Sequence, residues 1–445
     1  MIPVEIVDRI LSSLHTDQDY GSLESCSVVF PLLVDRHLYS QITFYISGGT
    51  LLRSSCFDTD DTYVVDSTVF SRTLFDHPHI LNCVRDVRII LVRLRPLVPQ
   101  HLQMISAILS ILTHIESLTL TTTGHSLTLW PALGPEFCAA FQNSLRLPSI
   151  KKVAISKFDG FSLNSFKDCK TLTNLRLHDL EFVDGRDIST PPYPRLSSLH
   201  LTAGLVTGPV VSWVKSTLHT LSLCVNSRFD FPKFRILIAA CSASLVNLEL
   251  SCADYYGGSW IFCDGTGISL IILEYFNFTH SDHPQLQLSL LEHIIFRCSI
   301  FVEDVIGANF FGFNLLVPFL TTISNISSAS PIRLTLHIGF NFCCTSATPI
   351  PDWSNITNIL VLPIFRHPIE FHITYQSWEQ EVGTLLVDSL EQHSDVKKLL
   401  VDGTLVLIKG KAPHGYGIHL NYPDLDPHLT GTCNGEVSSS HKCSV

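Results

Sequence analysis

The chain has 445 residues, of which 46% are hydrophobic and only 16% charged, and its formal net charge is −11. This length is compatible with two or three domains or with one extended array of repeats. The charged fraction lies well below the roughly 25% of an average soluble domain, which predicts much buried or adhesive surface. Because no cluster of Lys or Arg stands out, the composition argues against a nucleic-acid-binding protein.

The first residues lack the basic charge of a signal peptide. The most apolar run, residues 305–320, is short for a membrane span and contains Asn309, Asn314 and Pro318. We therefore expect no membrane contact. The 14 cysteines are scattered through apolar runs and none forms a CxxC pair, so we interpret them as core residues. Reduced thiols predict a cytoplasmic and/or nuclear location.

Residues 1–45 are predicted to form one helical unit. Pro3 suits the first helical position, where its missing N–H costs nothing. One helical face then carries Val7, Ile10, Leu11 and Leu14. Two further short helices are predicted from LESCSVVF and from PLLVDRHLYSQITF. Residues 46–80 are polar and rich in turn residues, which predicts a connector.

Residues 81–409 follow a different pattern, in which short apolar strands alternate with helix-like segments. The strict form LxxLxL occurs consecutively at 172, 196, 218 and 245, where chance would give about one match. Less regular runs follow, such as LEHIIF, IRLTLHI and IEFHITY. One strand and one helix per unit is typical of a solenoid. A doubly wound sheet is the alternative, but no Gly-rich phosphate loop follows any strand. Residues 410–445 are predicted to be a flexible tail.

The opening of the chain resembles the F-box. The family pattern begins Leu-Pro-x-Glu-Ile, continues Ile-Leu-x-x-Leu and has a later Ser-Leu-Val, and the chain has IPVEIVDRILSSL and SVV at these places. The matching residues are Ile2, Pro3, Glu5, Ile6, Ile10, Leu14, Ser27, Val28 and Val29. With its repeats, the chain most resembles the F-box proteins with degenerate leucine-rich repeats that are abundant in fungi. The expected fold class is α/β, with an N-terminal three-helix F-box-like module (1–45) followed by an irregular leucine-rich-repeat-like solenoid (81–409).

The resemblance implies a Skp-type adaptor as partner and, through it, a cullin–RING ubiquitin ligase of the SCF type. The aliphatic side chains left over when one helical face turns inward are the natural contact. The residues implied in adaptor binding are Ile2, Pro3, Val4, Glu5, Ile6, Ile10, Leu14, Leu23, Val28 and Val29. The alternative is that Ile2, Val4 and Ile6 pack on the start of the repeats.

A target protein is expected to bind the strands of the repeats. Side chains that alternate with the core leucines of LxxLxL must face outward. Those predicted to contact the target are Asn174, Arg176, Ser198, His200, Thr220, Ser222, Asn247 and Glu249.

Sequence motifs of catalysis are missing: there is no GxSxG, HExxH, P-loop or GxGxxG. The histidines of HPH at 77–79 and the aspartates of FDTDDTY lack the spacing of a metal site, so we expect no cofactor and no metal. The sequence thus predicts a non-enzymatic substrate receptor of an SCF-type ligase. The alternatives are a repeat scaffold that no longer binds the adaptor and, less favoured, a hydrolase whose triad is dispersed along the chain.

Overall fold

The structure is a computed structural model. It describes residues 39–47, 63–64, 67–92, 99–123, 127–182, 194–202, 205, 208–214, 217–225, 231–252, 288–302, 330–342, 354–376 and 388–411.

The described strands form one parallel sheet of 14 strands whose order follows the chain. From β3 onward each strand pairs with its successor, except that β4 pairs directly with β6 and β5 pairs with β6 beside this path. At the other end of the sheet β1 lies between β2 and β3. The strands are β1 (Gln41–Ser47), β2 (Tyr63–Val64), β3 (Asp86–Val92), β4 (Ser117–Thr123), β5 (Thr128–Leu129), β6 (Lys152–Phe161), β7 (Asn174–Phe182), β8 (Ser198–Thr202), β9 (Thr220–Val225), β10 (Asn247–Cys252), β11 (His293–Val302), β12 (Ile332–Phe342), β13 (Phe365–Gln376) and β14 (Leu405–Lys411).

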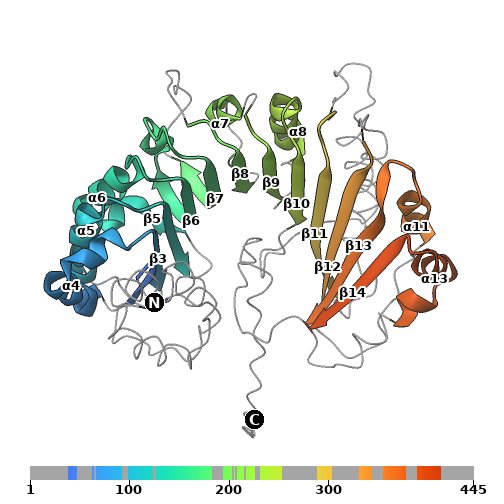
Figure 1. Cartoon of the computed structure of the whole chain (residues 1–445), viewed down its shortest axis with the longest axis horizontal. Helices are drawn as coiled ribbons and strands as arrows, with labels where there is room; N and C mark the ends of the chain where they lie inside the picture. Colours follow the sequence, from blue (N-terminus) through green and yellow to red (C-terminus); the bar gives the residue numbers. More distant parts are fainter. Residues whose placement is uncertain are drawn as a thin grey trace, which may run out of the picture.

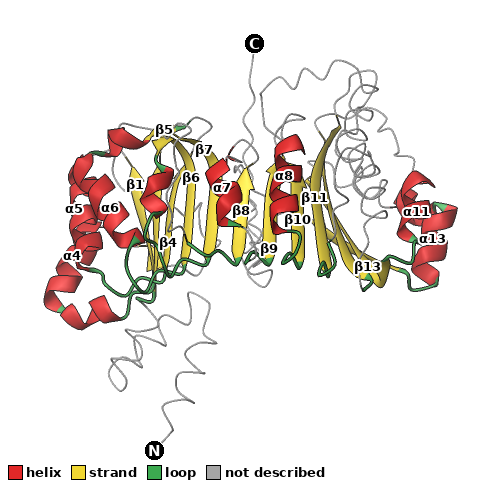
Figure 2. Ribbon diagram, turned by 90° about the horizontal axis from the view of Figure 1, so that it is seen from above, coloured by secondary structure: helices red, strands yellow, loops and turns green. Residues whose placement is uncertain are grey.

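The described helices cover one side of this sheet. They are α4 (Ser67–Asp76), α5 (Pro99–Ile111), α6 (Pro135–Leu145), α7 (Gly208–Trp213), α8 (Phe231–Cys241), α11 (Ser354–Leu360) and α13 (Ser394–Val401). Figure 1 shows the sheet as an arc with these helices on its outer side, and Figure 2 shows the same arrangement from above. Parallel strands need crossover connections, and here the described helices of those connections all lie on the same face. The inner, concave side of the arc carries none of the described helices.

The expected fold class is wrong. The described residues form one large parallel sheet with few helices, not a three-helix module followed by a solenoid, and only the assignment to the α/β class holds. Nor does the sheet reverse its strand order, as a doubly wound sheet does. The error begins at QITFYIS, whose first residues were expected to end a third helix. Ile42, Phe44 and Ile46 alternate along β1 and are at most 1% exposed, which is the period of a strand rather than of a helix.

The sheet also crosses the domain boundaries that the sequence predicted. Strand β1 runs through residue 45, and β2 and α4 fall within the stretch interpreted as a connector. Phe70 of α4 is fully buried and contacts Phe44 edge-on, so this stretch contributes to the core. At the other end β14 continues to Lys411. The remainder of the expected tail lies outside the described residues.

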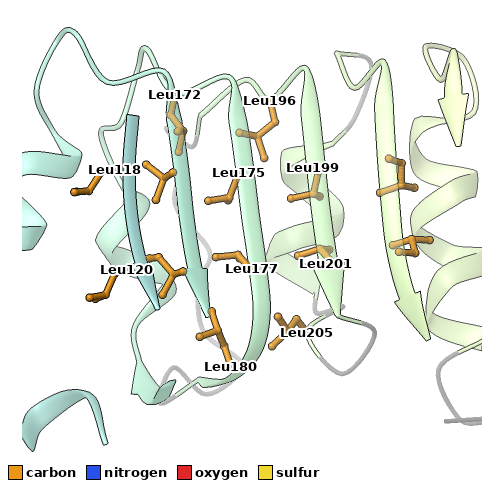
Figure 3. Close-up of a cluster of buried hydrophobic side chains, with 14 of the residues drawn as sticks. Leu118, Leu120, Leu172, Leu175, Leu177, Leu180, Leu196, Leu199, Leu201 and Leu205 are labelled. Atoms are coloured by element: carbon orange, nitrogen blue, oxygen red, sulfur yellow. The ribbon is translucent and has the colours of Figure 1, made fainter. Parts of the chain in front are cut away.

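The core lies between the sheet and the helices. Every second residue of the strands points into this core. Many of these residues are leucines, and Figure 3 shows them side by side on neighbouring strands. Leu175, Leu177, Leu199 and Leu201 are each at most 1% exposed. Full burial of one such side chain stabilises the fold by roughly 1.5–3 kcal/mol. Because the leucines alternate with polar residues, the same strands must present a polar surface on the opposite side.

Helix α5 illustrates how the outer layer closes this core. Pro99 occupies its first position, where no backbone N–H donor is needed. Its buried side chains are Leu102, Ile105, Ser106, Ile108 and Leu109. This spacing places one stripe of the helix on the sheet. No described helix is both long enough and apolar enough to cross a bilayer.

Candidate protein-binding face

The eight residues predicted to contact a target lie together on the inner side of strands β7 to β10. We call the inner side of the described strands the polar face. Strand register aligns the eight in two rows. The first row is Asn174, Ser198, Thr220 and Asn247. The second row is Arg176, His200, Ser222 and Glu249. Neighbouring strands are about 4.8 Å apart, so each row places four side chains within roughly 15 Å.

The residues implied in adaptor binding are not placed. Ile2, Pro3, Val4, Glu5, Ile6, Ile10, Leu14, Leu23, Val28 and Val29 all lie outside the described residues.

Cross-strand hydrogen bonds hold three of the four side chains of the first row, those of Asn174, Thr220 and Asn247. The Asn247 side-chain amide donates to the Thr220 hydroxyl at 3.2 Å. The Ser197 hydroxyl, at the entry to β8, reaches the Asn174 side-chain oxygen at 3.3 Å. Such cross-strand bonds hold the side chains in fixed positions before any partner arrives. The row is therefore a preorganised set of donors and acceptors.

The second row contains buried polar groups. Burial lowers the pKa of His200 to about 3, with smaller contributions from His178 and Arg176, so its imidazole is neutral at physiological pH. Beside it the Ser222 hydroxyl is 6% exposed and has no hydrogen-bond partner. A buried hydroxyl without a partner typically costs about 1–3 kcal/mol.

Next to these rows, His178, Asp179 and Thr202 form a polar cluster. The His178 Nδ1 atom lies 2.5 Å from the Thr202 hydroxyl and 3.4 Å from an Asp179 carboxylate oxygen. A hydroxyl–imidazole–carboxylate relay needs the two oxygen groups on opposite ring nitrogens. Here both contact the same nitrogen, which is not the geometry of a relay. The Thr202 hydroxyl also accepts the Asp179 backbone N–H at 3.0 Å, so it ties β8 to β7.

A local distortion of the sheet positions this cluster. Lys157 and Asp179 both have positive φ, of 64° and 47°. They are adjacent in register, since Ser156 pairs with His178 and Phe158 with Leu180. Lys157 is 6% exposed, and burial lowers its pKa while Asp179 raises it. Non-glycine residues in this backbone region are costly and concentrate where side chains must be re-aimed.

The polar face extends beyond the predicted residues, onto β11, β12 and β13. In register with the first row stand His293, Arg333 and Arg366. Four residues further along β11 and β12 stand Arg297 and His337, and His372 is the register partner of His337 on β13. Sequence reasoning missed all six, although the alternation of LEHIIF, IRLTLHI and IEFHITY carries the same signal. These segments depart from LxxLxL, so that motif does not predict which of their residues face outward.

Two ion pairs cross this part of the face. Arg297 of β11 pairs with Glu249 of β10, and Arg333 of β12 pairs with Glu370 of β13 at 2.6 Å. The Arg333 guanidinium, followed by His372, lowers the pKa of Glu370 although some burial opposes this. Glu249 of the second row therefore links the residues predicted to contact a target with the basic residues of β11 to β13.

At the opposite end of the polar face, the outward positions of β4 are the hydroxyl residues Ser117, Thr119, Thr121 and Thr123. Thr121 and Ser156, on β4 and β6, are hydrogen-bonded to each other and buried. On β3 burial raises the pKa of Asp86, while Arg88, at 4.0 Å, acts in the opposite direction.

The chain matches no model of a known protein family and no curated protein sequence.

Three cysteine thiols in the described part of the chain are shielded by burial. Burial raises the pKa of the Cys138 and Cys169 thiols to about 11 and that of Cys241 to about 12. Such thiols stay protonated and are weak nucleophiles. Among the described residues, no group of three or more His, Cys, Asp or Glu side chains could hold a metal ion.

Proposed function

We propose that this protein is the substrate-receptor subunit of an SCF-type cullin–RING ubiquitin ligase. Its polar face would bind the target, and its opening segment would bind a Skp-type adaptor. The observation that supports target binding is the register of eight polar side chains on the face of β7 to β10 that the helices leave open. The proposed location is the cytoplasm and/or the nucleus.

A rigid sheet is a suitable platform for such binding. Its backbone hydrogen bonds are satisfied between strands, and its other side is fixed by the leucine core. Side chains on rigid elements keep their positions to a fraction of an ångström, which reduces the entropy lost when a partner binds. The outward residues can therefore differ freely while the fold stays the same.

The adaptor half of the proposal rests on the sequence IPVEIVDRIL. If the residues after Pro3 are helical, Val7, Ile10 and Leu14 share one face, and Ile2, Val4 and Ile6 remain for a second partner. A groove on another protein that accepts a helix recognises such aliphatic anchors. In this role the chain itself does no chemistry. It holds the target near the ubiquitin-carrying subunit, and proximity raises the rate of transfer.

Adaptor binding can be tested with purified components. Full-length protein carrying Pro3→Ala and Ile6→Asp is expected to recover at least tenfold less Skp-type adaptor in a pull-down than the wild type. The matched control is Val401→Asp, which places the same charge on an exposed aliphatic residue of α13 (78% exposed). Equal recovery by wild type and the double variant would refute the ligase role and leave a scaffold that binds targets only.

Target binding needs a separate experiment. Proteins that accumulate when the chain is removed from its cell are candidate targets. Restoring wild-type protein should return their levels to normal, whereas Thr220→Arg, which places a bulky charge at the centre of the first row, should not. Lys398→Glu on the helix side is the control. If the Thr220 variant restored turnover as well as the wild type, the polar face would not be the target site.

A further inference from the structure

The six residues on β11 to β13 that the sequence reasoning missed form one basic patch. We use this name for His293, Arg333, Arg366, Arg297, His337 and His372. They occupy two lines on the same face with one register row between them, and on these three strands every position of both lines is Arg or His. Lys and Arg number 29 and His 21 among 445 residues, so composition alone does not give such a run.

Like charges stand directly opposite one another within the patch. Arg333 and Arg366 are register partners on β12 and β13. The partner of Arg333 on the other side is His293, whose pKa is lowered mainly by burial, so the like charges are those of the two arginines. Like-charged residues directly opposite on neighbouring strands destabilise a sheet. Glu370 offsets this for Arg333. Arg366 is exposed and forms none of the ion pairs of the described residues.

The second line is also arranged for an anion. The His337 and His372 rings stack with centroids 4.3 Å apart and an interplanar angle of 24°. The pKa of His337 is lowered to about 3, mainly by burial and then by Arg297, His372 and His293, so its ring is neutral at physiological pH. A neutral imidazole can donate one N–H to a carboxylate. The two lines together offer guanidinium and imidazole donors on either side of a central strip.

That central strip contains Ile295, Thr335 and Glu370 in register. Strands β11 and β13 lie about 10 Å apart, and the two lines are four residues apart, or roughly 13 Å. The area suits a few carboxylate side chains of a peptide rather than the continuous backbone of a nucleic acid. Arg297 already binds the Glu249 carboxylate and Arg333 the Glu370 carboxylate, so carboxylate is a group that these arginines bind.

We propose that the basic patch binds a segment of the target protein that is rich in Asp and Glu. This inference rests on the proposed function, and it names the chemistry of the target. Carboxylates of the segment would bind Arg366 directly and share Arg333 and Arg297 with Glu370 and Glu249. The neighbouring polar rows on β7 to β10 would contact the residues that follow.

The test uses the full-length protein and a fluorescently labelled peptide of ten glutamates, measured by fluorescence anisotropy in about 50 mM salt. The controls are peptides of ten glutamines and ten lysines and a ten-nucleotide single-stranded DNA. We expect the glutamate peptide to bind at least tenfold more tightly than each control. Tighter binding of the DNA would overturn the proposal in favour of a nucleic-acid site, and equal binding of the glutamine peptide would overturn it outright.

Variants assign the binding to the patch. Arg366→Glu should weaken binding of the glutamate peptide about tenfold, and Arg366→Lys should retain most of it. Lys398→Glu has the same change in net charge on the helix side and should bind like the wild type. Thermal melting of each variant checks its folding. If Arg366→Glu and Lys398→Glu weakened binding equally, the loss would be caused by the change in net charge rather than by the patch, and the patch proposal would fail.

The two proposals fail in different ways. Loss of target turnover in the Thr220→Arg variant together with no binding of the glutamate peptide would retain the receptor function and refute an acidic target segment. Normal target turnover in both Thr220→Arg and Arg366→Glu would instead refute the receptor function of the polar face.

Discussion

At the scale of single residues, burial decides the charge of the histidines on the polar face. His200 and His337 stand among outward-facing side chains, and yet burial is the main cause that lowers the pKa of each to about 3. An imidazole in the unfolded chain has a pKa near 6.5. Both rings are therefore neutral donors and acceptors in the folded protein across the physiological range.

This difference in pKa predicts how stability depends on pH. Between pH 6.5 and about 3 the unfolded chain binds protons at these histidines and the folded chain does not. The free energy of unfolding should therefore fall as the pH falls below 6.5, by at most about 1.4 kcal/mol per pH unit for each histidine. Above pH 6.5 these two residues should contribute no slope.

Urea denaturation at pH 7.5, 6.5 and 5.5 measures this. The double variant His200→Gln and His337→Gln should lose less stability between pH 6.5 and 5.5 than the wild type, and His77→Gln, in an exposed turn, should behave like the wild type. The range stays above pH 5 because Asp86, whose pKa is raised by burial, acts in the opposite direction when it titrates. An unchanged slope in the double variant would contradict the prediction.

At the scale of elements, each strand has one side for the core and one for recognition. In β8 the core side carries Leu199 and Leu201 and the polar side carries Ser198 and His200. The side chains of one strand alternate with a period of two, so a slip of one residue would exchange the two sides completely. The leucines therefore fix which residues are available to a partner.

Truncation of a core residue and of its polar neighbour should separate these roles. Leu199→Ala, at a position that is 0% exposed, should lower the free energy of unfolding by about 2–5 kcal/mol. Ser198→Ala should change it by no more than about 0.5 kcal/mol. Urea denaturation of both variants decides this. A comparable loss in both would mean that the two faces of β8 are not energetically distinct.

At the scale of the whole molecule, the sheet is ordered like the chain. From β7 to β14 each strand pairs only with its neighbours in sequence, and β13 and β14 share no strand pairing with β3 or β4. Opening at one end of such a sheet breaks few contacts at the other end. Stability should thus be distributed locally.

Hydrogen exchange can test this locality. Leu399→Ala on α13, a residue 5% exposed, should lower amide protection in β13 and β14 and leave β3 to β6 nearly unchanged. Leu177→Ala, at the centre of the sheet, is the comparison and should affect β6 to β8. A uniform loss of protection over the whole sheet in the Leu399 variant would show that the protein opens as one cooperative unit instead.

The alternation of LxxLxL was sufficient to predict part of the surface. It identified Leu175, Leu199 and Leu221 as core and their polar neighbours as outward-facing, because side-chain direction in a strand depends only on local period. The prediction of a third helix was wrong at QITFYIS, because the helical pattern of the preceding residues was extended into residues that form strand β1. The LxxLxL motif also passed over IRLTLHI and IEFHITY, whose spacing differs although their period does not.

By itself, the sequence determined the class of structure, the leucine core and the side of each regular strand that faces outward, since these follow from local period and hydrophobicity. Only the tertiary structure decided that all described strands belong to one sheet and which outward residues become neighbours. Arg333 and Arg366 are 33 residues apart in the numbering, and their pairing depends on register between two strands separated by an intervening segment. Such contacts are set by the packing of whole elements, and a local sequence pattern contains no information about that packing.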